Sequence, residues 1–121
     1  MVLVDSSVWI DHFRRGNPVL RDLLNDSLAL IHPFIIGELA CGGIKNRKKF
    51  FADLAQLPLA ISAAHDEVLG LLHERELWGR GIGWIDIHLI ASALLSRCQL
   101  WTLDLGLRAA AISAKVDCLS A

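Results

Sequence analysis

The chain has 121 residues, a length typical of one domain, and we expect a single domain over residues 1–121. Hydrophobic residues make up 54% of it, more than so small a core can enclose, so part of the apolar surface is expected to meet a partner. The formal net charge of −1 excludes binding of nucleic acid through overall charge, so any such binding needs a local basic patch.

The cysteines and the apolar segments indicate where the protein works. Cys41, Cys98 and Cys118 are widely spaced and form no C-x-x-C pair, which favours free thiols in a reducing compartment. No apolar run approaches the roughly 18 residues of a membrane span, and Asp5 interrupts the N-terminal apolar run. We therefore expect a cytoplasmic protein with no membrane association.

The first apolar run of the chain ends in a carboxylate and two hydroxyls. Val2 to Val4 show no polar alternation, which is typical of a parallel strand that is covered on both faces. Asp5, Ser6 and Ser7 follow, at the end of the strand where ligands bind in sheets of this kind. One of the two serines can also cap the next helix. The sequence thus predicts a functional site around Asp5.

The rest of the chain alternates between helical and extended patterns. Helices are expected over residues 8–15, through 23–24, from 33 to about 40, and over 46–54, 64–78, 87–95 and 105–112. Strands are expected at 28–31, 100–103 and 116–119, with 57–61 as a connector or a short strand. This alternation predicts an α/β fold with three layers, α/β/α, around a central and mostly parallel sheet.

Four acidic residues fall at the ends or starts of these elements. Asp5 and Asp104 end strands, Asp86 begins a helix, and Glu38 lies on a helix that is entered from a strand. Carboxylates gathered at one rim repel each other unless a hard divalent cation such as Mg²⁺ or Mn²⁺ binds between them. Such a cation would support hydrolysis of a phosphate ester. Taken singly, an aspartate at a strand end or helix start is more often a structural cap than a metal ligand.

Four motifs follow one another along the chain. They are Val4-Asp5-Ser6-Ser7-Val8-Trp9-Ile10-Asp11, Gly37-Glu38-Leu39-Ala40, Gly83-Trp84-Ile85-Asp86-Ile87-His88-Leu89-Ile90-Ala91-Ser92-Ala93 and Leu100-Trp101-Thr102-Leu103-Asp104. In order and spacing they resemble the motifs of the PIN-domain ribonuclease toxins of VapBC type. The resemblance covers essentially the whole chain, and four ordered motifs are far more specific than any one carboxylate.

The resemblance implies a site and a function. The implied metal site, for Mg²⁺ or Mn²⁺, consists of Asp5, Glu38, Asp86 and Asp104, supported by the hydroxyls of Ser6, Ser7 and Thr102. The implied activity is that of an endoribonuclease, in which metal-activated water cleaves RNA. The implied role is that of the toxin in a type II toxin–antitoxin pair, a homodimer inhibited by an antitoxin whose tail covers the acidic groove.

One departure from the family pattern concerns the last motif. Family members often carry a basic residue or a further acid shortly after it, whereas residues 105–107 are Leu-Gly-Leu here. This leaves open whether Asp104 is a direct metal ligand, and Arg108 could replace the lost basic contact.

Two other functions stay open at this stage. One is a catalytically inactive PIN module that binds RNA or acts as a scaffold. The other is a phosphotransfer domain of receiver or haloacid-dehalogenase type, which also has an Asp after its first strand. A dehalogenase-type phosphatase needs a second Asp two residues later, where this chain has Ser7, and a receiver needs a late-strand Lys that the sequence lacks.

Basic and aromatic residues give weaker signals. The densest basic run consists of Lys45, Arg47, Lys48 and Lys49, and it fits a contact with an RNA backbone or a solvated helix face equally well. The tryptophans are expected mainly in the core, with Trp84 able to edge the site because it lies beside Asp86. The five histidines lack zinc-site spacing, and we assign none as a ligand.

Overall fold

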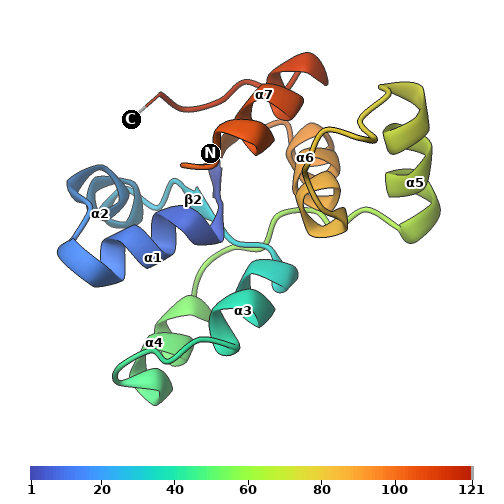
Figure 1. Cartoon of the computed structure of the whole chain (residues 1–121). Helices are drawn as coiled ribbons and strands as arrows, with labels where there is room; N and C mark the ends of the chain where they lie inside the picture. The colour runs from blue at the N-terminus through green and yellow to red at the C-terminus, as the bar shows by residue number, and fades with distance from the viewer. Residues whose placement is uncertain (121) are drawn as a thin grey trace.

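A parallel sheet with the strand order β2-β1-β3 organises the chain. The computed structural model describes residues 1–120. Strand β1 (Val2–Val4) is central, and it pairs with β2 (Ala29–Leu30) on one side and β3 (Gln99–Trp101) on the other. Helices enclose this sheet (Figure 1), which gives the predicted α/β architecture.

The helices follow the sequence prediction closely. They are α1 (Ser6–Arg15), α2 (Pro18–Asn25), α3 (Pro33–Ala40), α4 (Arg47–Leu54), α5 (His65–Glu74), α6 (Trp84–Ser96) and α7 (Leu105–Ser113). Figure 1 shows α5 outermost against α6, while α4 lies near α3 and α1. No helix in residues 1–120 is long and apolar enough to cross a membrane.

Burial explains why the first strand forms where it does. Leu3 and Val4 are completely buried, and Val2 is nearly so, because helices cover both faces of β1. A strand in this position loses the alternation of polar and apolar residues. Burying each side chain stabilises the fold by about 2 kcal/mol. The strand ends at Val4. The backbone N–H of the next residue, Asp5, still donates to the Trp101 carbonyl at 2.9 Å.

Local capping sets the start of α3. Pro33 occupies the first turn, where its missing N–H leaves no hydrogen bond unmade. The Nδ1 atom of His32 accepts a hydrogen bond from the Phe34 N–H at 2.9 Å. This cap fixes the helix that carries Glu38, and it confirms the predicted start.

The prediction that the helix from residue 64 continues to about Trp78 is wrong. Helix α5 ends at Glu74, because Glu76 adopts a left-handed backbone with φ of 52°. The Leu77 N–H then bonds back to the Leu72 carbonyl at 3.0 Å, which is the hydrogen bond of a Schellman C-cap. Leu77 itself is buried, so packing of this side chain outweighs the cost of the left-handed residue.

The outer strands are shorter than predicted. Residues 57–61 and 116–119 contribute only single parallel bridges, Leu59 to Ile31 and Cys118 to Leu100. Strand β3 ends at Trp101 rather than at residue 103. This early end matters for the site, because it frees Thr102 to turn its hydroxyl toward β1.

Candidate functional site

Asp5 is buried at the carboxyl end of β1 and is held by two hydroxyls. Its Oδ2 accepts hydrogen bonds from Ser7 Oγ at 2.7 Å and from Thr102 Oγ1 at 2.8 Å. The two hydroxyl oxygens lie 3.3 Å apart. Ser7 Oγ and Thr102 Oγ1 also accept from the backbone N–H groups of Leu103 and Asp104, each at 3.0 Å. One Asp5 oxygen is thus fixed by a network that joins the ends of β1 and β3.

Three aspartates share one pattern, in which the protein holds a single carboxylate oxygen. Asp86 Oδ2 accepts from the Gly83 N–H at 3.1 Å, at the start of α6. Asp104 caps α7, and its Oδ1 accepts from the N–H groups of Gly106 and Leu107 at 2.8 and 3.1 Å. No hydrogen-bond donor within residues 1–120 meets the second oxygen of Asp5, Asp86 or Asp104. Each aspartate therefore keeps one oxygen for a ligand.

The carboxylates lie close enough to repel each other. Burial, followed by the charges of Asp5 and Asp104, raises the pKa of Asp86, although its bond from Gly83 acts in the opposite direction. Burial, then Asp5 and Asp86, raise the pKa of Glu38, and a hydrogen bond from Ser6 opposes this shift. All four predicted acids therefore belong to one electrostatic cluster.

The chemistry of this cluster fits a hydrated divalent cation. The donors are oxygens, which Mg²⁺ and Mn²⁺ prefer. Within residues 1–120, however, no three His, Cys, Asp or Glu side chains form a closed cage ready for an ion. Mg²⁺ keeps several of its water ligands and commonly takes only one or two carboxylates directly, so an open cluster suits it.

The three supporting hydroxyls divide between two acids. Ser7 and Thr102 donate hydrogen bonds to Asp5, whereas Ser6 lies close enough to Glu38 to lower the pKa of that carboxyl. The sequence left open which serine served Asp5. Both hydroxyls of the Asp5 network also accept hydrogen bonds from backbone N–H groups. They are therefore held in place and orient the Asp5 carboxylate.

The basic run is only partly free to contact RNA. Arg47 donates to the carbonyls of Gly42 and Ala40 at 2.8 and 3.0 Å, at and just after the C-terminal end of α3. Lys49 pairs with Asp53 on its own helix at 3.0 Å. Lys45 and Lys48 are exposed, so they are the members of this run that stay available.

The tryptophans do not all belong to the core, which corrects the sequence prediction. Trp9 and Trp101 are buried, but Trp78 is 57% exposed and Trp84 is 37% exposed. Trp84 lies in the first turn of α6, two residues before Asp86. Its exposed ring is consistent with the predicted position at the edge of the site.

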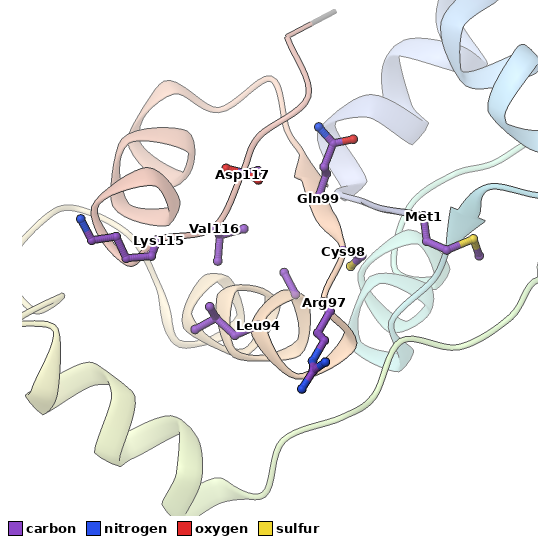
Figure 2. A pocket seen from close by; sticks show the side chains of 9 residues that line it. Met1, Leu94, Arg97, Cys98, Gln99, Lys115, Val116 and Asp117 are labelled. Carbon is purple, nitrogen blue, oxygen red and sulfur yellow. The ribbon is translucent and has the colours of Figure 1, made fainter.

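A large hollow lies at the opposite ends of the strands. A cavity of about 380 Å³ is lined by side chains that include Met1, Arg97, Gln99, Lys115 and Asp117 (Figure 2). Met1 precedes β1 and Gln99 begins β3, so this cavity lies at the amino ends of the strands. It contains none of the predicted acids and is separate from their cluster.

Gly83 has a role in the site that was not predicted from the sequence. Its N–H is the group that holds Asp86, as in the reciprocal half of a capping box. The signal was present, because an acidic residue three positions after a helix N-cap is typical of this arrangement. Gly83 therefore helps to orient one of the central carboxylates.

Comparisons with known proteins agree with this geometry. A family model described as the PIN domain matches residues 2–113. Ribonuclease VapC32, from two strains of Mycobacterium tuberculosis, is 47% identical over 114 residues, which cover 91% of this chain and 90% of the relative.

Two solved structures share the fold. The crystal structure of PAE2754 from Pyrobaculum aerophilum has a TM-score of 0.63 at 20% identity, covering 90% of this chain and 84% of that chain. The crystal structure of FitAcB from Neisseria gonorrhoeae has a TM-score of 0.62 at 16% identity, covering 99% and 97%. At such low identity these two likenesses concern the fold alone.

Proposed function

The chain belongs to the PIN-domain family, and from this membership we propose that it is a metal-dependent endoribonuclease. The activity named for its relative, a ribonuclease, supports the choice of RNA as substrate. Family membership also argues against the phosphotransfer alternative. The observation that carries the proposal is the pattern of the aspartates, each with one oxygen held and one oxygen free.

The roles of the residues follow from their surroundings. Asp5 and Asp86 are the central ligands of the proposed ion, because each lies within electrostatic reach of a second acid. When bound, Mg²⁺ or Mn²⁺ supplies a positive charge that activates water and neutralises charge developing on the phosphodiester. Ser7 and Thr102 keep the Asp5 carboxylate in one orientation.

The remaining two acids have distinct proposed roles. Glu38 is exposed and its pKa is raised, so its ionised carboxylate is suited to accept a proton from the attacking water. Asp104 has one oxygen committed to the N-terminus of α7 and supports the site from its rim. Hydrolysis in this arrangement needs no covalent intermediate with the protein.

Metal-dependent cleavage is the direct test. Purified protein is incubated with cellular RNA in Mg²⁺ or Mn²⁺, and in excess EDTA. We expect cleavage with the ions and none in EDTA. Full cleavage in EDTA would refute the metal site, and absence of cleavage with every ion would favour the inactive PIN module.

We also propose that the chain is a toxin with a protein partner, in keeping with the VapC name of its relative. Large apolar side chains such as Leu59, Ile61 and Leu105 are exposed. A mainly apolar cavity of about 350 Å³, whose lining includes Trp9, Phe13 and Phe50, offers further surface for an antitoxin. The three cysteines are free, as the proposed cytoplasmic location requires.

These partner proposals have separate tests. Light scattering of the purified chain is expected to give the mass of a homodimer, and a stable monomer at micromolar concentration contradicts it. The product of the adjacent gene is expected to inhibit cleavage when it is added to the chain. Cleavage that no neighbouring gene product inhibits contradicts the toxin role.

A further inference from the structure

An aromatic band lies beside the carboxylates and takes no part in the hydrolysis described above. It consists of His32, Phe34, His65, Trp84 and His88. We propose that two of its exposed rings, Phe34 and Trp84, stack an unpaired base of the RNA next to the phosphodiester that is cleaved. This inference rests on the proposed function and specifies single-stranded RNA as the substrate.

The rings of the aromatic band support one another. The ring of His88 lies between the two exposed rings, with its centroid 4.7 Å from that of Phe34 and 5.0 Å from that of Trp84. On the outer sides, His32 lies 5.0 Å from Phe34 and His65 lies 5.1 Å from Trp84. Rings already fixed by their neighbours lose little conformational entropy when a base stacks on them.

The exposure of the rings differs in the way that a stacking platform requires. Phe34 and Trp84 are 40% and 37% exposed, whereas His32 and His88 are buried. Large aromatic side chains left in water on two neighbouring elements mark a binding surface. His65 is exposed as well, so the aromatic band combines two buried rings with three exposed ones.

One end of the aromatic band lies on the side of the proposed catalytic acids. Phe34 precedes Glu38 by four residues, so the two side chains lie on the same side of α3. Trp84 is two residues before Asp86, a spacing that directs the two side chains to different sides of α6, and its ring is joined to Phe34 through His88. A base stacked on Phe34 would therefore belong to a nucleotide near the phosphate held by the acids, and Trp84 would extend the platform away from them.

Two unsatisfied ring nitrogens favour a nucleobase over an apolar protein segment. Within residues 1–120, His32 Nε2 and His88 Nδ1 are buried and have no hydrogen-bond partner. A buried polar atom without a partner costs free energy, so such atoms commonly await a ligand or water. The edge of a base carries both donors and acceptors beside its flat face, whereas an apolar side chain has neither.

The state of His32 fits a neutral aromatic surface. Its Nδ1 accepts from the Phe34 N–H, so Nε2 carries the proton and can donate. Burial, and then the neighbouring His88, lower the pKa of His32 to about 4, so the ring is uncharged at neutral pH. The band thus recognises the face of a base rather than a phosphate.

RNA binding without cleavage tests the proposal. The Asp5→Asn protein in EDTA serves as the parent, and fluorescence anisotropy measures its binding to a labelled single-stranded oligoribonucleotide. Phe34→Leu and Trp84→Leu in this parent are each expected to weaken binding about tenfold, as removal of a stacking ring does. Phe34→Tyr keeps a ring and is expected to bind like the parent. Circular dichroism checks that each variant is folded.

Two controls separate stacking from a general loss of apolar surface. Trp78→Leu removes another exposed tryptophan, whose ring neighbours His73 and lies outside the aromatic band, and is expected to leave the affinity unchanged. An oligonucleotide with abasic sugars is expected to bind the parent and both leucine variants equally weakly. Annealing the labelled strand to its complement is expected to remove the difference between parent and variants, because paired bases are not free to stack.

The outcomes distinguish this inference from the proposed function. If both leucine variants bind the single strand as the parent does, the stacking inference is wrong, whether or not the wild-type chain cleaves RNA. If the wild-type chain fails to cleave but the leucine variants lose binding, the band is supported and the proposed hydrolysis is wrong. If the variants turn a dimer into a monomer at unchanged RNA affinity, the band is a protein contact and the inference fails.

Discussion

The two ends of the parallel sheet differ in what they offer a ligand. At the carboxyl end, hydroxyls and backbone N–H groups orient the acids, and Asp5 and Asp104 each accept two hydrogen bonds. At the amino end, a cavity of about 380 Å³ is present (Figure 2), and its lining contains none of the four acids. Oriented groups, rather than hollow volume, distinguish the end that is suited to catalysis.

The largest expected effect comes from removing a carboxylate at the carboxyl end. Asp5→Asn and Asp86→Asn are each expected to reduce RNA cleavage at least about a hundredfold, because loss of a ligand exceeds the usual cost of losing its supporting groups. Asp117→Asn removes one charge from the amino-end cavity and serves as the matched control. The measurement is the rate of cleavage in Mg²⁺. If all three variants lose the same share of the cleavage rate, the two ends of the sheet do not differ in their importance for catalysis.

A smaller loss is expected when a supporting hydroxyl is removed. Thr102→Val deletes the 2.8 Å hydrogen bond to Asp5 and keeps the shape of the side chain. We expect the Mg²⁺ concentration needed for half-maximal cleavage to rise roughly 10-fold to 100-fold, which is typical for a group that orients a metal ligand. Thr102→Ser retains the hydroxyl and is expected to cleave like the parent. If Thr102→Ser does not cleave like the parent, the loss in Thr102→Val comes from altered packing and not from the missing hydroxyl.

The carboxyl end should also make stability depend on pH when no metal is bound. The pKa values of Asp86 and Glu38 are raised in the folded chain, so between the ordinary and raised values the folded state binds more protons than the unfolded state. The stability that these groups contribute is present at low pH and is lost as the pH rises through the raised values. Thermal melts in EDTA from pH 4 to pH 7 measure this trend.

Variants of the same acids sharpen the pH prediction. Asp86→Asn in EDTA is expected to flatten the pH dependence and to melt higher at pH 7, because repulsion among the acids is relieved. Adding Mg²⁺ is expected to raise the melting temperature of the wild-type chain more than that of the variant. A variant that melts at the wild-type temperature throughout would show that the acids do not repel in the folded chain.

The smallest expected effect concerns the basic run on α4. Lys48→Glu with Lys49→Glu is expected to weaken RNA binding slightly and to reduce its salt dependence by about one to two counterions. Lys49 already pairs with Asp53, so most of the effect should come from Lys48. A salt titration of RNA affinity measures both quantities. If the RNA affinity and its salt dependence are both unchanged, the basic run faces solvent and does not contact RNA.

The sequence predicted those parts of the fold that depend on local chemistry. Strand β1, the start of α3 at Pro33 and the Asp104 cap of α7 follow from apolar runs and capping residues. The end of α5 does not, because Glu76 takes a left-handed backbone that usually favours glycine. That choice depends on the burial of Leu77, which only the packed structure reveals.

The features of the site also divide into those that local sequence predicts and those that depend on the packed structure. The four acids were predicted because they stand at element ends within motifs that resemble a known family. The pairing of Ser7 and Thr102 with Asp5 was not, because it depends on the register of β1 against β3. The aromatic band was missed for a different reason, since His88 was considered only as a metal ligand. Its spacing of four residues from Trp84 could have indicated that the two rings meet.

The bond between Thr102 and Asp5 spans 97 positions of the chain, and this separation has a consequence for protein synthesis. A ribosome makes Asp5 well before Thr102, which directly follows β3. Contacts so distant in sequence form late, after the intervening segments have been made. The nascent chain therefore lacks an oriented Asp5 until Thr102 has been made, and the proposed cleavage of RNA is not expected before then.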